Sequence, residues 1–278
     1  MTALLTGNHP LIAKPRPFLK WPGGKARLLD RILPLIPAEL QAYHEVCLGG
    51  GAVFFGLRRR GMVCPATLYD LNAELVRCYR AVRHQPDEVV DAFDRHADRH
   101  GESYFLELRQ QAPAALTDVE LAGRMIYLNR ACFNGKYIVR RNGALGVAWG
   151  QHSCVSLDAD NLLSASVALK NVELIQGDLA CILDRARPGD LVYFDPPYPG
   201  GFVQYTPVGF DESDHVRLAE VCRRLHRKGC LFLLSNGDVP FVRWLYRDFQ
   251  IVPVQALKSI AANPSGRGLA NELLIQNF

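Results

Sequence analysis

Asp195-Pro196-Pro197-Tyr198 places a carboxylate, two residues without a backbone N–H and an aromatic ring in direct succession. The run follows Leu191–Phe194, whose continuous apolar side chains are typical of a buried strand. Because proline ends a strand and donates no hydrogen bond, the carbonyls beside it stay available as acceptors. A carboxylate and such a carbonyl can accept both hydrogens of an –NH2 group while the tyrosine stacks on the ring that carries it. The order predicts a socket for a flat, aminated ring, with a proline-rich turn as the structural alternative.

A second set consists of Gly49-Gly50-Gly51 and Asp70, which comes 21 residues after Gly49. Glycine lets the backbone approach a ligand, and an acid at the end of the next strand can accept hydrogen bonds from ribose hydroxyls. A dinucleotide site requires a further glycine at position 54, where this chain has Phe54. The spacing therefore favours a small adenosyl ligand without a pyrophosphate, with a tight turn before a helix as the structural alternative.

The glycines of Phe18–Lys25 (FLKWPGGK) belong to no P-loop. That motif needs glycine at position 19 and Ser or Thr at position 26, and this chain has Leu19 and Ala26. The segment instead carries the indole of Trp21 and the ammonium of Lys25 around a glycine turn. These groups suit a ligand with an aromatic ring or a carboxylate, although the spacing is equally typical of a surface turn.

Two further polar pairs follow apolar runs. Gly177-Asp178 comes after Val172–Ile175, and Ser235-Asn236 comes after Leu231–Leu234. Since ligands bind at the carboxyl ends of the strands in an open α/β sheet, both pairs are candidates for the same site. Each pair on its own is also typical of an ordinary turn.

The charges are distributed unevenly along the chain. Residues 83–120 carry nine acidic and four basic side chains, whereas residues 121–157 carry no carboxylate. A basic stretch without acids suits a surface that faces a polyanion, because each neutralised phosphate releases counterions. Interleaved aromatic and amide groups can stack on bases and read their edges, so we predict a DNA-facing segment, with an ordinary loop as the alternative. Its basic residues are Arg124, Arg130, Lys136, Arg140 and Arg141. The candidate DNA contacts within it are Arg130, Phe133, Asn134, Lys136, Arg140 and Arg141.

The rest of the chain alternates between strand and helix patterns. Helices are expected, for example, over Ala52–Arg60, Asn72–Arg83 and Asp211–Arg227. A strand, glycine turn, helix and strand in succession predict an α/β fold with an open, doubly wound sheet. Residues 84–165 interrupt this alternation, so we expect an inserted, mainly helical domain within a doubly wound domain formed by 1–83 and 166–278. The expected strands are His44–Leu48, Thr67–Tyr69, Val172–Ile175, Leu191–Phe194, Leu231–Leu234, Ile251–Leu257 and Leu273–Ile275.

Composition limits the class of protein. At 278 residues and 49% apolar composition, the chain can form one or two domains with buried cores. No apolar run approaches the about 18 residues of a membrane helix, and residues 1–17 contain no apolar segment of a signal peptide. The net charge of +4 indicates no partner by itself, and the eight cysteines form no C-x-x-C pair. We therefore expect a soluble cytoplasmic protein with free thiols and no bound metal.

Six motifs, in their order along the chain, resemble those of the Dam-type (D12 class) DNA adenine-N6 methyltransferases. They are FLKWPGGK, GGGAVFF, LYDLN, CFNG, YFDPPY and SNGD, and the resemblance extends from about Phe18 to Ile275. It implies a Rossmann-like methyltransferase fold, S-adenosylmethionine as methyl donor and double-stranded DNA as partner. It also implies direct methyl transfer, without a metal or a cysteine nucleophile, to an adenine rotated out of the duplex into the Asp195–Tyr198 socket.

The resemblance also assigns roles to individual residues. Residues 84–165 match the family's target-recognition domain, Asn134 lies in its DNA-contacting hairpin, and Lys20 matches a lysine that contacts a base. Asp178 matches the position that reads the adenine of the cofactor. The glycine turn, with Gly49 and Gly51, is expected beside that ligand. The family's other cofactor contacts are matched by Trp21, Lys25, Asp70 and Asp195.

Two positions depart from the family pattern. Glu45-Val46-Cys47 stands where the family often has Glu-Pro-Phe, and Ile138 stands where members that read GATC carry an arginine. Arg140 or Arg141 could take over that contact. The sequence therefore leaves the recognition site open, and it says nothing of a restriction endonuclease partner.

Several alternatives to this function stay open. A methyltransferase for cytosine N4 or for adenine in RNA presents the same –NH2 group to a similar socket. From other classes we retain a DNA-binding protein without catalysis and an NAD-dependent oxidoreductase. Phe54 and the Asp195–Tyr198 run disfavour the oxidoreductase.

Overall fold

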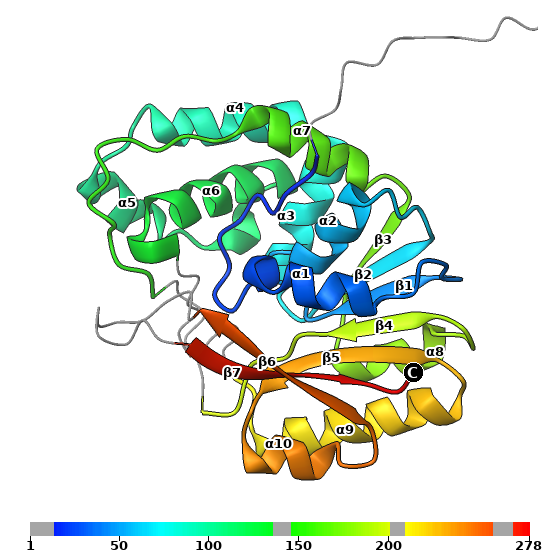
Figure 1. The fold of residues 1–278 in the computed structure, drawn as a ribbon. Coiled ribbons are helices and arrows are strands. Elements are labelled where there is room, and N and C mark those ends of the chain that lie inside the picture. Colours follow the sequence, from blue (N-terminus) through cyan, green and yellow to red (C-terminus); the bar gives the residue numbers. More distant parts are fainter. Residues whose placement is uncertain (1–13, 136–145, 201–208, 258–268) are drawn as a thin grey trace, which may run out of the picture.

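A computed structural model describes residues 14–135, 146–200, 209–257 and 269–278, which form a seven-stranded sheet with helices on both faces (Figure 1). The strand order is β3-β2-β1-β4-β5-β7-β6, with β1 to β5 parallel and β7 antiparallel to both neighbours. The predicted α/β, doubly wound fold is confirmed. The strands are β1 (Tyr43–Val46), β2 (Ala66–Asp70), β3 (Val172–Gln176), β4 (Leu191–Phe194), β5 (Leu231–Gly237), β6 (Gln250–Leu257) and β7 (Leu269–Gln276).

The topology brings two of the predicted chemical sets to one place. The strand order reverses between β1 and β4, which pair in parallel and are buried along their whole length. Ligands of doubly wound sheets bind at the carboxyl ends of the strands beside such a reversal. There, β1 is followed by the turn Gly49-Gly50-Gly51 and β4 is followed by Asp195.

Most strands differ from the prediction by a residue or two at an end, and β7, expected over Leu273–Ile275, extends over Leu269–Gln276. β1 ends at Val46 because Cys47 adopts a left-handed backbone with φ of 63°. β5, expected to end at Leu234, continues to Gly237. Ser235-Asn236, which the sequence also allowed in a turn, is fully buried and pairs with β7. Because β7 is distant from β5 in the sequence, the local pattern around Leu231–Gly237 does not reveal this pairing.

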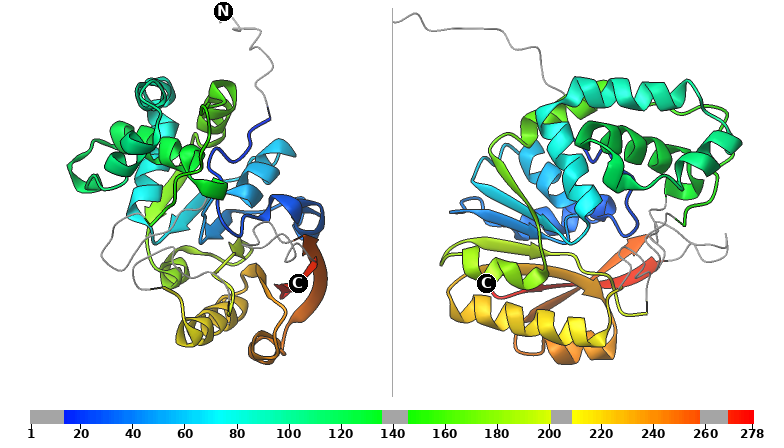
Figure 2. Two further views of the ribbon diagram at one scale, coloured as in Figure 1. Left: turned by 90° about the vertical axis from the view of Figure 1, so that its left-hand side faces the viewer. Right: turned by 180° about the vertical axis from the view of Figure 1, so that it is seen from behind.

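Helices cover the sheet in two layers (Figure 2). One layer contains α1 (Leu29–Ile32), α2 (Ala52–Arg59), α3 (Ala73–His84) and α7 (Ala159–Ala168), and the other contains α8 (Ile182–Arg185), α9 (Glu212–Arg227) and α10 (Pro240–Leu245). A hydrophobic core lies on each face of the sheet, one under α1, α2, α3 and α7 and the other under α8, α9 and α10. Along β4, Tyr193 packs into the former and its neighbours Val192 and Phe194 pack into the latter, because successive side chains of a strand point to opposite faces. Within the described ranges, none of these helices has the length and apolar character needed to span a bilayer.

The segment between β2 and β3 extends the first layer. It contains α4 (Pro86–Ala97), α5 (Glu102–Leu108) and α6 (Asp118–Ala131), with α6 buried along most of its length against α3 and α4. A Cβ atom on Gly123 would lie 2.5 Å from the Cβ of Ala92, so the close approach of α4 and α6 depends on that glycine. The apolar side chains of α4 to α6 share one core with α2 and α3. The boundary predicted at residue 165 lies inside α7, which packs against α3.

Arg124 of α6, one of the basic residues of the carboxylate-free segment, is part of this core. Its side chain is 2% exposed, and its guanidinium donates to the carbonyls of Leu108, Arg109 and Gln111. These carbonyls lie at the end of α5, where a helix leaves its last acceptors without partners. Arg124 therefore caps α5 and does not face DNA.

Glu45 of β1 carries a buried carboxyl group with an unusual proton affinity. The side chain is 2% exposed, and burial raises its pKa from 4.5 to about 8. Hydrogen bonds from the hydroxyl of Tyr43 (2.6 Å) and the amide of Phe54 (2.8 Å) to its Oε2 oppose that shift. The folded protein therefore keeps this proton at a pH where the unfolded chain releases it.

We expect Glu45→Gln to reduce the pH dependence of stability. Between pH 4.5 and about 8, the raised pKa makes the free energy of unfolding fall as the pH rises, by at most about 1.4 kcal/mol per pH unit. Glutamine keeps an acceptor oxygen for both hydrogen bonds and does not titrate. Urea unfolding of both proteins across this window measures the difference in slope. Parallel curves would show that Glu45 is ionised in the folded protein.

Candidate active site

Three carboxylates lie with Cys47 at the carboxyl edge of the sheet, where β1 to β4 end side by side. Burial raises the pKa of the Cys47 thiol well above its usual value, and the charges of Asp70, Asp195 and Asp178 raise it further. Asp70 ends β2, Asp178 follows β3 and Asp195 follows β4. The structure thus brings together the acids that the sequence placed at separate strand ends.

Asp195 is held by a nearly buried lysine. The Nζ of Lys25 lies 2.7 Å from Oδ1 of Asp195, donates to the carbonyl of Gly23 at 2.6 Å and lies 4.8 Å from the ring centroid of Tyr198. The Lys25 side chain is 6% exposed and that of Asp195 is 20% exposed. Burial raises the pKa of Asp195, and the charge of Lys25 opposes this shift. Lys25 therefore fixes both the carboxylate and the face of the ring.

Glu272 of β7 completes this network, and the sequence analysis missed it. The hydroxyl of Tyr198 donates to Oε2 of Glu272 at 2.7 Å. Glu272 pairs with Gly237 of β5, so its strand lies beside the loop that follows β4. The available signal was a carboxylate inside an otherwise largely apolar strand, Leu269–Gln276, which needs a reason when the strand is central.

The glycine turn forms a cradle closed by Trp21. Gly49 and Gly51 have φ of 50° and 66°, a region that favours glycine. A Cβ atom on Gly49 would lie 2.6 Å from Cδ1 of Trp21, so the indole packs directly on the turn. Asp70 accepts the amide of Gly49 through Oδ2 (3.0 Å) and the amide of Asn72 through Oδ1 (2.9 Å). With the amide of Leu71 as a third donor, the carboxylate still keeps a lone pair for a ligand.

Leu71 is a second residue that the sequence analysis missed. It directly follows Asp70, and its side chain is 51% exposed at the ligand-binding edge of the sheet. An exposed apolar side chain beside an acid offers a surface to a flat ring. The signal was the apolar residue in the motif LYDLN at the point where the strand pattern ends.

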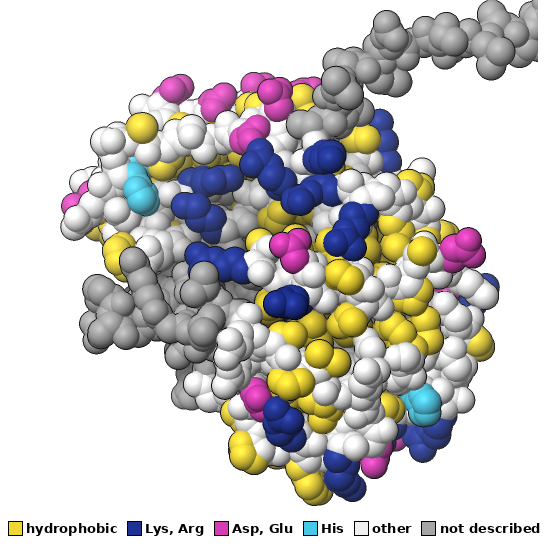
Figure 3. All heavy atoms as spheres, viewed as in Figure 1, with side chains coloured by type: hydrophobic (Ala, Val, Ile, Leu, Met, Phe, Trp, Pro, Cys, Tyr) yellow, Lys and Arg dark blue, Asp and Glu magenta, His cyan; other side chains and the backbone are white. Residues whose placement is uncertain are grey.

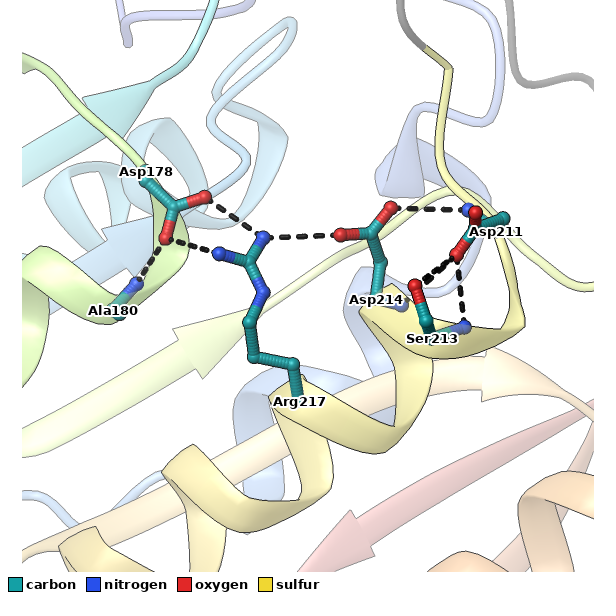
Figure 4. Close-up of polar contacts among 6 residues, drawn as sticks. All are labelled: Asp178, Ala180, Asp211, Ser213, Asp214 and Arg217. Atoms are coloured by element: carbon teal, nitrogen blue, oxygen red, sulfur yellow. Dashed lines mark hydrogen bonds and ion pairs between the residues drawn. The ribbon is translucent and has the colours of Figure 1, made fainter.

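Asp178 does not stand alone. It caps a short helical turn (Leu179–Cys181) by accepting the amide of Ala180 at 3.0 Å. Arg217 of α9 donates to both of its oxygens, at 3.0 and 2.9 Å, and also to Asp214 at 3.0 Å (Figure 4). A planar guanidinium that contacts both carboxylate oxygens fixes the orientation of that carboxylate.

A clamp joins α6 to the segment that carries Lys20 and Trp21. The buried side-chain amide of Asn129 accepts the N–H of Lys20 at 2.8 Å and donates to the carbonyl of Lys20 at 2.7 Å. The next residue, Arg130, donates to the carbonyl of Phe18 at 3.1 Å. The side-chain amide of Asn129 also donates to the carbonyl of Gly135. The Lys20 side chain packs against Gly135.

The predicted DNA contacts are only partly described. Lys20 and Asn134 are exposed, and Phe133 is 55% exposed at the start of the short helical turn Phe133–Gly135. Arg130 is half-buried, with one guanidinium nitrogen bonded inside the protein. The predicted contacts outside the described residues are Lys136, Arg140 and Arg141, and Ile138 lies there too.

The surface near these residues is basic. On the face seen in Figure 3, Lys and Arg side chains gather over the helical segment and the neighbouring N-terminal segment. Asp and Glu side chains lie along the outer edge, over α4. In the described residues, His, Cys, Asp and Glu side chains form no group of three that could hold a metal. The basic face suits a polyanion.

The chain is similar to DNA methyltransferases over most of its length. The model of the D12 class N6 adenine-specific DNA methyltransferase family matches residues 21–260. The type II methyltransferase M1.LlaDCHI of Lactococcus lactis subsp. cremoris is 34% identical over 275 residues, or 95% of each chain. The DNA adenine methylase of Serratia marcescens is 29% identical over 94% of this chain and 98% of its own. Among solved structures, the glycopeptide N-methyltransferase MtfA covers 88% of this chain and 64% of its own at TM-score 0.33 and 13% identity, too distant to extend the fold assignment.

Proposed function

Because the chain belongs to the D12 class of N6 adenine-specific DNA methyltransferases, it methylates N6 of adenine in DNA, and we propose how its residues divide that task. The Asp195–Tyr198 loop binds the target adenine after it has rotated out of the duplex. The glycine turn, Trp21 and Asp70 hold S-adenosylmethionine. The main support is the network of Lys25, Asp195, Tyr198 and Glu272 beside that turn.

The residues around the turn fit an adenosyl group. Asp70 still has a lone pair for a ribose hydroxyl, since the backbone amides of Gly49, Leu71 and Asn72 use three of the about four that a carboxylate offers. Leu71 offers its exposed apolar surface to the purine, and Asp178 offers an acceptor to the exocyclic amine. When bound, S-adenosylmethionine supplies a methyl group on a positively charged sulfur. Asp195, Asp70 and Asp178 all lie at the carboxyl ends of neighbouring parallel strands, so both ligands share one edge of the sheet.

In the proposed complex, this chain orients the N6 amine of the target. The Asp195 carboxylate and the Pro196 carbonyl accept the two N6 hydrogens, which directs the nitrogen lone pair out of the ring plane. Tyr198, fixed through its hydroxyl by Glu272, stacks on the base. Such positioning can supply roughly 7–11 kcal/mol, which exceeds the unstacking cost of about a few kcal/mol. As N6 gains positive charge, Asp195 stabilises it and accepts the proton that N6 releases.

We assign the DNA contacts to the helical segment 84–165 together with Lys20. The exposed ring of Phe133 can stack on a base, and Asn134 can bond to a base edge. Lys136, Arg140 and Arg141 stay predicted contacts to phosphate or guanine. Arg130 contributes mainly by holding Phe18, because its guanidinium bonds to that carbonyl.

Nucleoside analysis tests this function. The protein is incubated with labelled S-adenosylmethionine and, in parallel, with double-stranded DNA or with RNA, and each nucleic acid is digested to nucleosides. We expect label in N6-methyl-2′-deoxyadenosine from the DNA. Label in N4-methylcytosine would overturn the assignment of the socket to adenine, and preferential labelling of RNA would overturn the assignment of the substrate. Heat-denatured protein is the control.

A second expectation concerns target choice. A bidentate arginine contact to guanine is worth about 1–3 kcal/mol of discrimination, and Ile138 can contact a thymine methyl but cannot donate to guanine. We therefore expect methylation at a short defined site in which a neighbouring arginine reads guanine or the sequence differs from GATC. Sequencing of genomic DNA from a host without other adenine methylases, with and without this protein, identifies the site. Methylated adenines without a shared flanking sequence would show that the segment binds DNA but does not read it.

A further inference from the structure

We propose that Arg217 is a positioning residue that makes Asp178 selective for a purine with a 6-amino group. The inference rests on the proposed binding of S-adenosylmethionine at this edge of the sheet. It concerns a residue of α9 that none of the sequence motifs contains.

The hydrogen bonds that Asp178 accepts leave one lone pair of its carboxylate for a ligand. An ionised carboxylate offers about four lone-pair sites on two oxygens. Oδ1 accepts the amide of Ala180 and Nη1 of Arg217, both at 3.0 Å, so it is saturated. Oδ2 accepts Nη2 of Arg217 at 2.9 Å and keeps one lone pair (Figure 4). The side chain of Asp178 is 37% exposed, so a ligand can reach that oxygen.

Arg217 is itself held in place by Asp214. Its Nη2 donates to Oδ1 of Asp214, and Oδ2 of Asp214 accepts the amide of Asp211, the N-cap of α9. Both carboxylates and the guanidinium thus lie in one chain of bonds anchored on a helix terminus, as Figure 4 shows. Lysine could not replace this arrangement, because an ammonium lacks the fork that meets two oxygens at once.

The free lone pair on Oδ2 of Asp178 determines which purine can bind against it. The remaining lone pair on Oδ2 can only accept a hydrogen bond. A 6-amino purine donates to it, whereas a 6-oxo purine would place an oxygen against it. A site that uses a fixed polar group rejects the analogue that lacks the matching donor. Arg217 keeps the acceptor in one place, so loss of Arg217 should reduce the discrimination more than it reduces binding in general.

Calorimetric titration of the full chain with S-adenosylhomocysteine and S-inosylhomocysteine tests this inference. We expect the unaltered protein to prefer the adenosyl compound by roughly 10- to 100-fold, less than in a fully buried site because Asp178 is partly exposed. Arg217→Gln and Arg217→Lys should each weaken adenosyl binding by about 10-fold while leaving inosyl binding nearly unchanged. Arg185→Gln is the matched control, because Arg185 is as exposed as Arg217, at 47%, and pairs with Glu173 at 2.7 Å.

The outcomes separate this inference from the proposed function. An unchanged preference in both Arg217 variants would overturn the inference, and so would tighter adenosyl binding, which would mean that Arg217 competes with the ligand. Equal affinity of the unaltered protein for both compounds would overturn the role of Asp178. If the unaltered protein binds neither compound, the proposed cofactor site itself is wrong.

Discussion

Asp195→Ala is expected to lower kcat for methyl transfer by roughly 100- to 1,000-fold or more, with little change in DNA affinity. Asp195 directly follows the buried strand β4, and its carboxylate is the proposed acceptor for an N6 hydrogen. Removal of the group that bears the developing charge affects the transition state more than binding. Single-turnover methylation and a DNA-binding titration on the same preparation measure the two effects. Turnover within about 10-fold of the unaltered protein would contradict the assignment.

Loss of the Asp195 carboxylate also leaves the buried Lys25 without its ion-pair partner, and this loss of stability must be separated from the loss of catalysis. Asp195→Ala leaves Lys25 with 6% exposure and without its carboxylate, and such an orphaned charge costs about 3–5 kcal/mol when fully buried. Asp195→Asn keeps the shape and one acceptor oxygen. Lys25→Met combined with Asp195→Ala removes both charges and should recover stability without recovering activity. If the double variant also recovers methyl transfer, Asp195 serves only to balance Lys25.

Trp21→Ala and Asp70→Ala are expected to weaken the binding of S-adenosylhomocysteine by about 10- to 100-fold, and DNA binding much less. Hydrogen bonds to a charged group are worth about 1.5–3 kcal/mol, and the Asp70 carboxylate keeps a lone pair for a ligand. Trp21→Ala removes the indole that closes the cradle over Gly49. Calorimetric titration with each ligand measures both affinities.

Two controls separate a cofactor contact from general damage. Trp244→Ala removes another indole, 59% exposed on α10, and should leave both affinities unchanged. Asp70→Asn keeps one acceptor oxygen for the backbone amides and should bind the ligand better than Asp70→Ala. Unchanged affinity in both Trp21→Ala and Asp70→Ala would place the ligand elsewhere.

The strands and most of the acids could be predicted because their signals are local. A buried parallel strand is a short apolar run, and the residue after it lies at the ligand-binding edge whatever the rest of the chain does. For this reason Asp70, Asp178 and Asp195 lie at one edge of the sheet, at the ends of β2, β3 and β4. The glycine turn was equally readable, since its positive φ values suit glycine.

The partners of these acids could not be predicted because they come from distant elements. Glu272 reaches Tyr198 from β7, and Arg217 reaches Asp178 from α9. The distribution of charged residues along the sequence also does not show whether a given side chain points to the surface or into the core. Arg124 belongs to the basic stretch in the sequence, but it points into the core and caps α5.

The clamp of Asn129 and Arg130 has a consequence for the order in which the two substrates bind. Consecutive residues of α6 hold the backbone of Phe18 and Lys20, and the same short segment continues to Trp21 and Lys25. A shift of that segment on DNA binding is therefore transmitted to the cradle. Thermodynamic linkage requires the effect to be mutual: whatever factor DNA applies to the affinity for the methyl donor, the methyl donor applies to the affinity for DNA.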